Sequence, residues 1–168
     1  MTGLDPGRHC ILEIATLITS ADLKIIARGP DLAIKAGPAQ LRRMDPWPRR
    51  VHRKSGLLER IDTEGVPVAE AERQTLNFVR RYCRAHTAPL CGNSVWQDRR
   101  FLMKYMPRLH DFFHYRIVDV SSVKVAASAW YGDKYSAPQK ADAHRALADI
   151  EASVAELAHY RRTVFVKR

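Results

Sequence analysis

The sequence predicts an α/β domain whose sheet contains both antiparallel and parallel strands. Short apolar, β-branched runs follow one another closely before residue 36, which is typical of antiparallel strands joined by short turns. Farther along the chain, segments with apolar residues at helical spacing alternate with single short strands. The chain has 168 residues, of which 46% are hydrophobic, enough to bury the core of one domain. We expect that domain to span residues 1–168.

Three strands are expected first, arranged as an antiparallel meander. The run at residues 9–19 is apolar and β-branched except for Glu13, so most of it should be buried. The second run should end at Gly29-Pro30, because glycine and proline interrupt regular structure. The expected order is a strand over residues 9–19, a turn over 20–22, a strand over 23–28 and a short strand over 31–35.

Helices dominate the rest of the prediction. Residues 68–84 carry an apolar stripe, and the last helix, capped by Asp142, has apolar residues at alternating spacings of four and three. Residues 45–48 hold two prolines, which predicts a loop, and Pro107 should end the helix before it. Helices are expected over residues 38–44, from 57, over 68–84, over 97–105, from 121 to 130 and after 142, with strands at 89–92 and 114–120 and a loop over 131–141.

The net charge of +10 points to a polyanionic partner. Six basic residues and a single acid lie between Arg42 and Lys54, and Trp47 and His52 are interleaved with them. Basic side chains neutralise phosphates, and an aromatic face can stack on a base, so this stretch is a candidate for contact with nucleic acid. A solvated cationic surface that binds nothing is the alternative.

Several classes of protein are disfavoured by the sequence. No apolar run approaches the roughly 20 residues that cross a bilayer, so no membrane partner is expected. The first ten residues lack the apolar core of a signal peptide. Cys10, Cys83 and Cys91 form no C-x-x-C pair, so neither a disulfide framework nor a zinc site is predicted. We therefore expect a reduced, cytoplasmic setting.

Three segments carry residues that could take part in chemistry. Asp98 follows a predicted strand and turn, at the kind of junction where α/β proteins build sites, although it could simply favour the start of a helix. His144 and Asp149 could cooperate if the histidine precedes the helix that holds the aspartate; otherwise both are ordinary surface residues. Tyr115 and Arg116 could contact a base and a phosphate, or be plain strand-end residues.

These segments occur in a fixed order together with others. The ordered set comprises M-T-G-L-D-P, C-I-L-E-I-A-T-L-I-T, M-D-P-W with V-H-R-K-S-G-L, C-G-N-S-x-x-Q-D-R-R-F-L-x-K-Y-M-P, Y-R-I-V-D-V-S-S and H-R-A-L-x-D-I-x-x-S-V-x-E-L. H-x-A-x-x-D alone would be weak, but the whole set is specific and covers nearly the entire chain. It resembles the oligoribonuclease family, which belongs to the DEDD exonuclease superfamily and has the histidine variant of its last motif.

The resemblance implies a ribonuclease-H-like fold with a five-stranded mixed sheet flanked by helices, usually as a homodimer. It implies 3′-to-5′ removal of nucleotides from very short RNA oligonucleotides, down to dinucleotides. It also implies two divalent ions, Mg²⁺ or Mn²⁺, which stabilise the attacking and leaving oxygens of a phosphodiester displacement.

The resemblance further assigns roles to individual residues. Asp98 and Asp149 match metal-binding acids, and His144 matches the general base that acts on water. The residues that match substrate contacts are Leu4 as an apolar wedge beside the bases, Trp47 as an aromatic contact, His52, Ser94 and Arg116 around the 5′ phosphate, and Tyr115, which with Arg116 would come from the partner subunit.

One motif of the family has no counterpart in the sequence. In the family an Asp-x-Glu motif on the first, central strand directly precedes M-T-G-L, and here Met1 occupies that point. The resemblance therefore implies a domain truncated at its N-terminus, weak metal binding and little Mn²⁺-dependent cleavage of a dinucleotide. Two explanations stand side by side: a start assigned at an internal methionine, or a real short chain that is a non-catalytic binder of short RNA or an inactive remnant.

Overall fold

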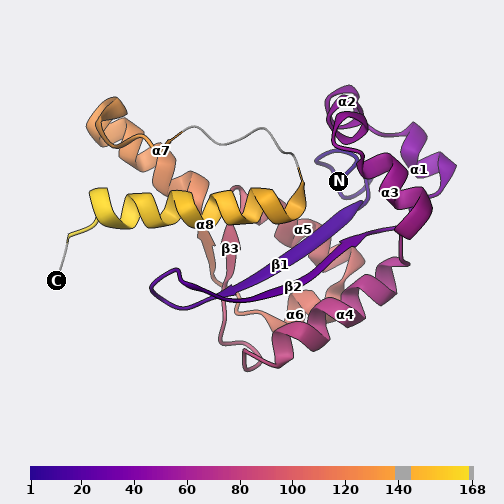
Figure 1. Ribbon diagram of the computed structural model, residues 1–168, viewed down its shortest axis with the longest axis horizontal. Coiled ribbons are helices and arrows are strands. Elements are labelled where there is room, and N and C mark those ends of the chain that lie inside the picture. The colour runs from indigo at the N-terminus through magenta and orange to yellow at the C-terminus, as the bar shows by residue number, and fades with distance from the viewer. Residues whose placement is uncertain (139–144, 167–168) are drawn as a thin grey trace.

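The computed structural model describes residues 1–138 and 145–166, and it confirms the predicted mixed α/β class (Figure 1). Strands β1 (Glu13–Thr19) and β2 (Ile25–Ala33) pair antiparallel, while β3 (Leu90–Gly92) and β4 (Ile117–Asp119) pair parallel. The strands of the described residues thus form two separate two-stranded sheets, as expected for the family's mixed sheet without its first, central strand.

Helices surround these strands in Figure 1, where α8 lies along β1, and α4 packs on the hairpin of β1 and β2. Their bounds are α1 Pro38–Arg42, α2 Pro46–Lys54, α3 Leu57–Glu64, α4 Val68–Arg80, α5 Val95–Tyr105, α6 Pro107–Phe112, α7 Val120–Tyr131 and α8 Ala146–Thr163, with a 3₁₀ turn at Gly132–Tyr135. None of the helices within the described ranges combines the length and the apolar character that crossing a membrane requires.

The predicted meander is wrong: one strand, β2, replaces the two that were expected. Ala15 pairs with Asp31 and Leu17 with Arg28, so Gly29 and Pro30 together oppose a single residue of β1. This is a β-bulge, a place where a strand tolerates a residue without an N–H group. The two residues therefore kink the strand without ending it.

The predicted loop at residues 45–48 is also wrong, because helix α2 begins at Pro46 with Asp45 in the extended conformation before it. Pro48 falls in the first turn too. The N–H groups of a first turn have no partner within the helix, so proline removes no hydrogen bond there. For the same reason Pro107 does not merely end α5 but begins a further helix, α6.

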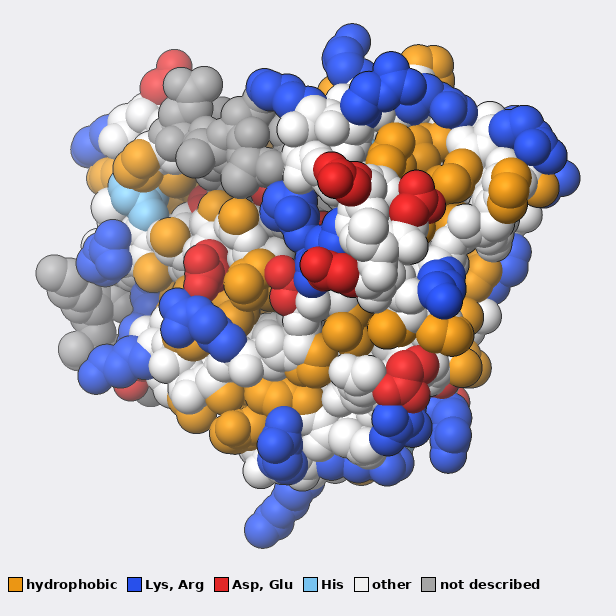
Figure 2. All heavy atoms as spheres, turned by 45° about the vertical axis from the view of Figure 1, so that its right-hand side comes forward, with side chains coloured by type: hydrophobic (Ala, Val, Ile, Leu, Met, Phe, Trp, Pro, Cys, Tyr) orange, Lys and Arg blue, Asp and Glu red, His pale blue; other side chains and the backbone are white. Residues whose placement is uncertain are grey.

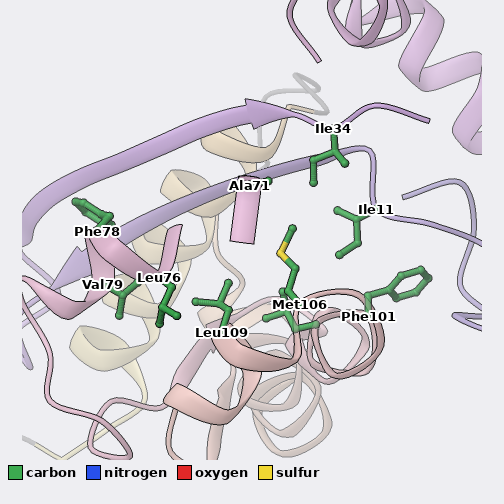
Figure 3. Packing of buried hydrophobic residues seen from close by; sticks show 10 residues of the cluster. Ile11, Ile34, Ala71, Leu76, Phe78, Val79, Phe101, Met106 and Leu109 are labelled. Carbon is green, nitrogen blue, oxygen red and sulfur yellow. The ribbon is translucent and has the colours of Figure 1, made fainter. Parts of the chain in front are cut away.

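The main core lies between the hairpin and helices α4, α5 and α6, as Figure 3 shows. Figure 3 shows Ile11 and Ile34 on the hairpin side and Met106 and Leu109 facing them. The buried apolar residues of this core are Ile11, Ile34, Ala71, Leu76, Phe78, Val79, Phe101, Leu102, Met106 and Leu109. The stripe predicted for residues 68–84 is confirmed by the burial of its members on α4.

The last helix has a different buried face from the one that its apolar spacing predicts. Its buried residues are Ser153, Glu156 and Tyr160. Glu156 accepts a hydrogen bond from Asn93 Nδ2 at 2.8 Å, so this polar face meets the end of β3. The predicted cap, Asp142, lies outside the described residues.

Candidate functional site

The segment of residues 1–10 connects α5 to α2, and this connection assembles the candidate site. On the α5 side, the carbonyl oxygen of Leu4 accepts hydrogen bonds from Gln97 Nε2 at 3.3 Å and from Arg100 Nη1 at 3.5 Å. Tyr105 Oη donates to the His9 carbonyl at 2.5 Å. These contacts leave the Leu4 side chain 65% exposed, as an apolar wedge would need to be.

The same segment is fixed to α2 at its other side. The Asp45 N–H donates to the Thr2 carbonyl at 2.9 Å, and His52 Nε2 lies 3.0 Å from the Met1 carbonyl oxygen. His9, within the segment, is buried, with Nε2 3.6 Å from Asp45 Oδ2. Because the segment contacts both helices, it links Leu4 to the helix of Asp98 on one side and to His52 on the other.

Trp47 lies on α2 as well, with its side chain 56% exposed. An exposed indole on the same helix as His52 has the planar apolar surface on which a base can stack. Trp47 thus lies on the helix that the segment of residues 1–10 contacts through Asp45 and His52.

Asp98 lies in the first turn of α5, and its environment changes its acidity. Surrounding protein atoms remove part of its hydration and raise its pKa to about 6, and the negative charge of Asp119 contributes in the same direction. Solvent still reaches the side chain. At neutral pH the carboxylate is ionised and accessible, which is the form that binds a cation.

Asp119 is a residue of this region to which the motifs assigned no role. It ends β4 opposite Gly92 of β3, and its Oδ1 accepts from Ser94 N at 3.0 Å and from Ser121 N at 2.9 Å. The bond from Ser94 ties the start of α5 to the end of β4, and Ser94 there has the left-handed conformation, with φ 51°. An acid at a strand end was visible in the sequence, but its partner 25 residues away was not.

Asp149 occupies the same position in α8 that Asp98 occupies in α5. Each aspartate lies in the first turn, four residues after the residue that precedes its helix (Ser94 and Arg145). Like Asp98, Asp149 is exposed. The histidine that the resemblance assigns as general base, His144, lies outside the described residues.

Glu13 holds the start of α8, and sequence reasoning gave it no role. Its Oε2 accepts from the Ala146 N–H at 2.9 Å, and its Oε1 lies 2.8 Å from Arg145 Nε and 3.1 Å from Arg60 Nη1. The Glu13 side chain is almost fully buried, so these contacts compensate its desolvation. In the sequence, this role was indicated only by the position of Glu13 as the one charged residue in an apolar predicted strand.

Tyr115 and Arg116 form a separate group just before β4. Arg116 Nε donates to Tyr115 Oη at 3.1 Å, and the Tyr115 ring stacks on His114 with ring centres 4.5 Å apart. Both side chains are exposed. All of these contacts are local, and none of them ties the pair to the group around Leu4 and His52.

A hollow of about 400 Å³ lies between the start of α5 and α7. Its lining includes the polar residues Ser94, Asp119 and Ser121 and the apolar residues Trp96 and Trp130.

The carboxylates of this region do not form a complete metal centre among residues 1–138 and 145–166. Within those ranges no group of three or more His, Cys, Asp or Glu side chains is placed to hold a metal ion. The donors that the structure does offer are carboxylates, the ligands that Mg²⁺ and Mn²⁺ prefer. The described residues therefore supply the right kind of donor but too few of them in one place.

Comparison with known proteins gives a consistent result. A family model described as "Exonuclease" matches residues 1–157. The chain is 51% identical over 161 residues to an oligoribonuclease of Yersinia pseudotuberculosis (serotype O:1b, strain IP 31758), covering 96% of this chain and 89% of the relative. It is 49% identical over 161 residues to an oligoribonuclease of Alkalilimnicola ehrlichii (96% and 83% covered). It is 48% identical over 166 residues to an oligoribonuclease of Paracidovorax citrulli (99% and 86% covered).

Proposed function

The chain belongs to the oligoribonuclease family of exonucleases, and on that premise we propose that it removes nucleotides 3′ to 5′ from RNA fragments only a few nucleotides long. The observation that carries the proposal is the segment of residues 1–10. It connects the helix of Trp47 and His52 to the helix of Asp98, with the exposed Leu4 between them. Apolar, aromatic, basic and acidic groups are thereby brought together around the segment. A short oligonucleotide, which has both bases and phosphates, requires this combination of groups.

The proposal gives each residue a role. Leu4 and Trp47 contact the bases, which have apolar faces whatever their identity. His52 and Ser94 contact the 5′ phosphate. Because a closed phosphate pocket excludes longer chains sterically, selection by length needs no reading of base edges. Asp98 and Asp149 supply carboxylates for divalent ions, and His144 is the general base.

Dependence on Mg²⁺ or Mn²⁺ is part of the proposal. Two carboxylates in the first turns of two helices support it, since ionised oxygens are the usual ligands of these ions. When bound, such ions stabilise the charge that develops on the phosphodiester.

We also propose that the protein acts as a homodimer in which Tyr115 and Arg116 reach the partner's site. Both residues are exposed, and their hydrogen bond and ring contact lie within their own segment, which leaves surface available to another molecule. A patch of exposed apolar side chains on α5 and α7, Trp96, Val125 and Trp130, supports such an interface. Aromatic residues are enriched at the centre of protein interfaces.

Incubation of the chain with 5′-labelled RNAs of two to seven nucleotides tests the proposal. Turnover should be low, because no Asp-x-Glu motif precedes M-T-G-L in this sequence. The products formed in Mg²⁺ or Mn²⁺ should be shortened one nucleotide at a time from the 3′ end, and EDTA should abolish them. Asp98→Asn and Asp149→Asn should each remove most of the turnover, whereas Asp62→Asn, an exposed aspartate of α3, should not. Cleavage from the 5′ end, or cleavage unaffected by EDTA, would contradict the proposal.

One observation favours a second function, non-catalytic binding of short RNA. It is the lack of a three-ligand metal group within the described ranges. The two functions differ in their readouts: a binder retains a labelled dinucleotide in the presence of Mn²⁺ without converting it to mononucleotides, whereas the exonuclease converts it.

A further inference from the structure

The outer face of α2 forms a cationic groove that the proposed site does not use. A hollow of about 520 Å³ is lined by Met44, Pro46, Arg49, Arg50, Arg53 and Lys54. Four of these six residues are cations and none is an acid. In Figure 2, Lys and Arg side chains gather along the upper edge of the molecule, over the end that carries α1 and α2.

The groove faces away from the site around Leu4. Residues two positions apart on a helix point about 200° apart, so Arg50 and His52 lie on opposite sides of α2. His52 contacts the Met1 carbonyl, and its neighbour Val51 is buried, which places that side of α2 against the protein body. Arg50 and Arg53 are exposed on the other side.

One cation of the groove is held in place by the backbone. The guanidinium of Arg49 donates from Nη2 to the carbonyl oxygens of Leu41, Arg42 and Met44, at 2.9, 3.1 and 3.3 Å. These bonds connect α2 to the end of α1 and fix the shape of the hollow. They also keep a positive charge at its edge, and no ion pair joins Arg49 to an acid among residues 1–138 and 145–166.

Arg50 and Arg53 differ from other arginines of the chain in their partners. Arg28, Arg73 and Arg161 each form an ion pair with an acid. Within residues 1–138 and 145–166, neither Arg50 nor Arg53 has an acidic side chain within ion-pair distance. Guanidinium groups pair with phosphate oxygens through two parallel hydrogen bonds, so two unneutralised arginines in one hollow suit consecutive phosphates.

We propose that this groove binds the sugar-phosphate backbone of a single-stranded oligonucleotide, as a second contact separate from the site around Leu4. Its ligand is a chain of linked phosphates, in contrast to a lone phosphate or a mononucleotide. The inference rests on the cations of α2 and needs no hydrolysis, so it goes beyond the proposed function and can fail or succeed independently of it.

Binding measurements in EDTA separate this inference from catalysis. The probes are a 5′-fluorescein single-stranded 12-nucleotide RNA and a labelled dinucleotide, followed by anisotropy from 50 to 200 mM NaCl. The test variant is Arg50→Ala with Arg53→Ala. The matched control is Lys24→Ala with Arg84→Ala, which removes the same charge from two exposed positions elsewhere. Melting curves of both variants check that each is folded.

The expected result is a change in salt dependence. Each neutralised phosphate of a single strand contributes about 0.7 to the slope of log K against log[salt], so losing two contacts should lower the slope by about 1.4. The wild type and the control should then lose about seven-fold more affinity for the 12-mer across this salt range than the test variant does. The dinucleotide should bind all three proteins alike.

Three outcomes would overturn the inference. The first is an equal salt slope for the test variant and the control, which would reduce the groove to a solvated surface. The second is an equal loss of affinity for the dinucleotide, which would make the groove part of the site around Leu4. The third is displacement of the 12-mer by millimolar 5′-mononucleotide at constant ionic strength, which would identify the ligand as an isolated phosphate.

Discussion

Asp98 is the residue whose local environment has the clearest measurable consequence. Its folded-state pKa of about 6 lies above the ordinary value of 3.8, because burial removes hydration from the carboxylate and Asp119 repels it. Between these two pH values the folded protein binds more protons than the unfolded chain, so this group lowers stability as the pH rises from about 4 to above 6. Below about pH 4 the carboxyl is protonated in both states and the effect disappears.

We therefore expect Asp98→Asn to melt above the wild type at pH 7.5 in EDTA and at the same temperature near pH 4. The difference should be about 1–3 °C, since solvent access to the side chain reduces the desolvation penalty. Thermal unfolding followed by circular dichroism measures it, with Asp62→Asn as the control. A variant that is less stable than the wild type at pH 7.5 would show that burial does not penalise this carboxylate.

His144 supports a second prediction at this scale. If it is the general base of the proposed reaction, His144→Ala should reduce turnover by about 10²-fold or more while the affinity for a dinucleotide changes little. Single-turnover rates and dinucleotide binding in EDTA measure the two quantities separately. His110→Ala, on α6, is the matched control and should keep its rate. Equal rates for the two variants would remove His144 from this role.

At the scale of elements, local sequence patterns predicted several helices and strands correctly but failed at positions that hold proline or glycine. Helix α4 and strands β3 and β4 lie within the predicted segments, because apolar periodicity is a local property of the sequence. Helix α2 was missed because proline is unfavourable in a helix interior but not in a first turn, and the pattern does not fix where the first turn falls.

The bulge in β2 depends on contact with another element. A Cβ atom at Gly29 would lie 2.5 Å from Cε1 of Phe78 and 3.0 Å from the Thr16 carbonyl oxygen. We expect Gly29→Ala to lower the free energy of unfolding by about 1–3 kcal/mol, because Phe78 is buried in the core and cannot move freely. Urea unfolding measures this change. Gly37→Ala, where the nearest atom is 3.8 Å away, should cost less, and equal effects would mean that α4 does not press on the bulge.

At the scale of the whole molecule, exposed apolar side chains of α5 and α7 lie around one hollow. Trp130 is 73% exposed and lines this hollow together with Ser94 and Trp96. A protruding indole and a hollow on one face can complement each other across a two-fold axis. This geometry supports the proposed homodimer.

Trp130→Glu should therefore convert a dimer to a monomer, because a charge would be buried at the centre of the interface. Light scattering after gel filtration gives the molar mass directly. The control Phe165→Glu introduces the same charge at another exposed aromatic residue, near the end of the described chain, and should leave the mass unchanged. A wild type that is monomeric at micromolar concentration would contradict the proposed dimer.

The sequence by itself determined the α/β class, the position of most helices and strands, and membership of the exonuclease family, since each of these depends on local periodicity or on motifs in order. Only the tertiary structure decided that Leu4 is held by Gln97 and Arg100, that Asp119 acts on Asp98, and that Glu13 holds the start of α8. These contacts join residues 21 to 133 positions apart, and their energy depends on burial and distance. Neither the burial of a side chain nor the distance between two distant residues is defined until the chain has folded.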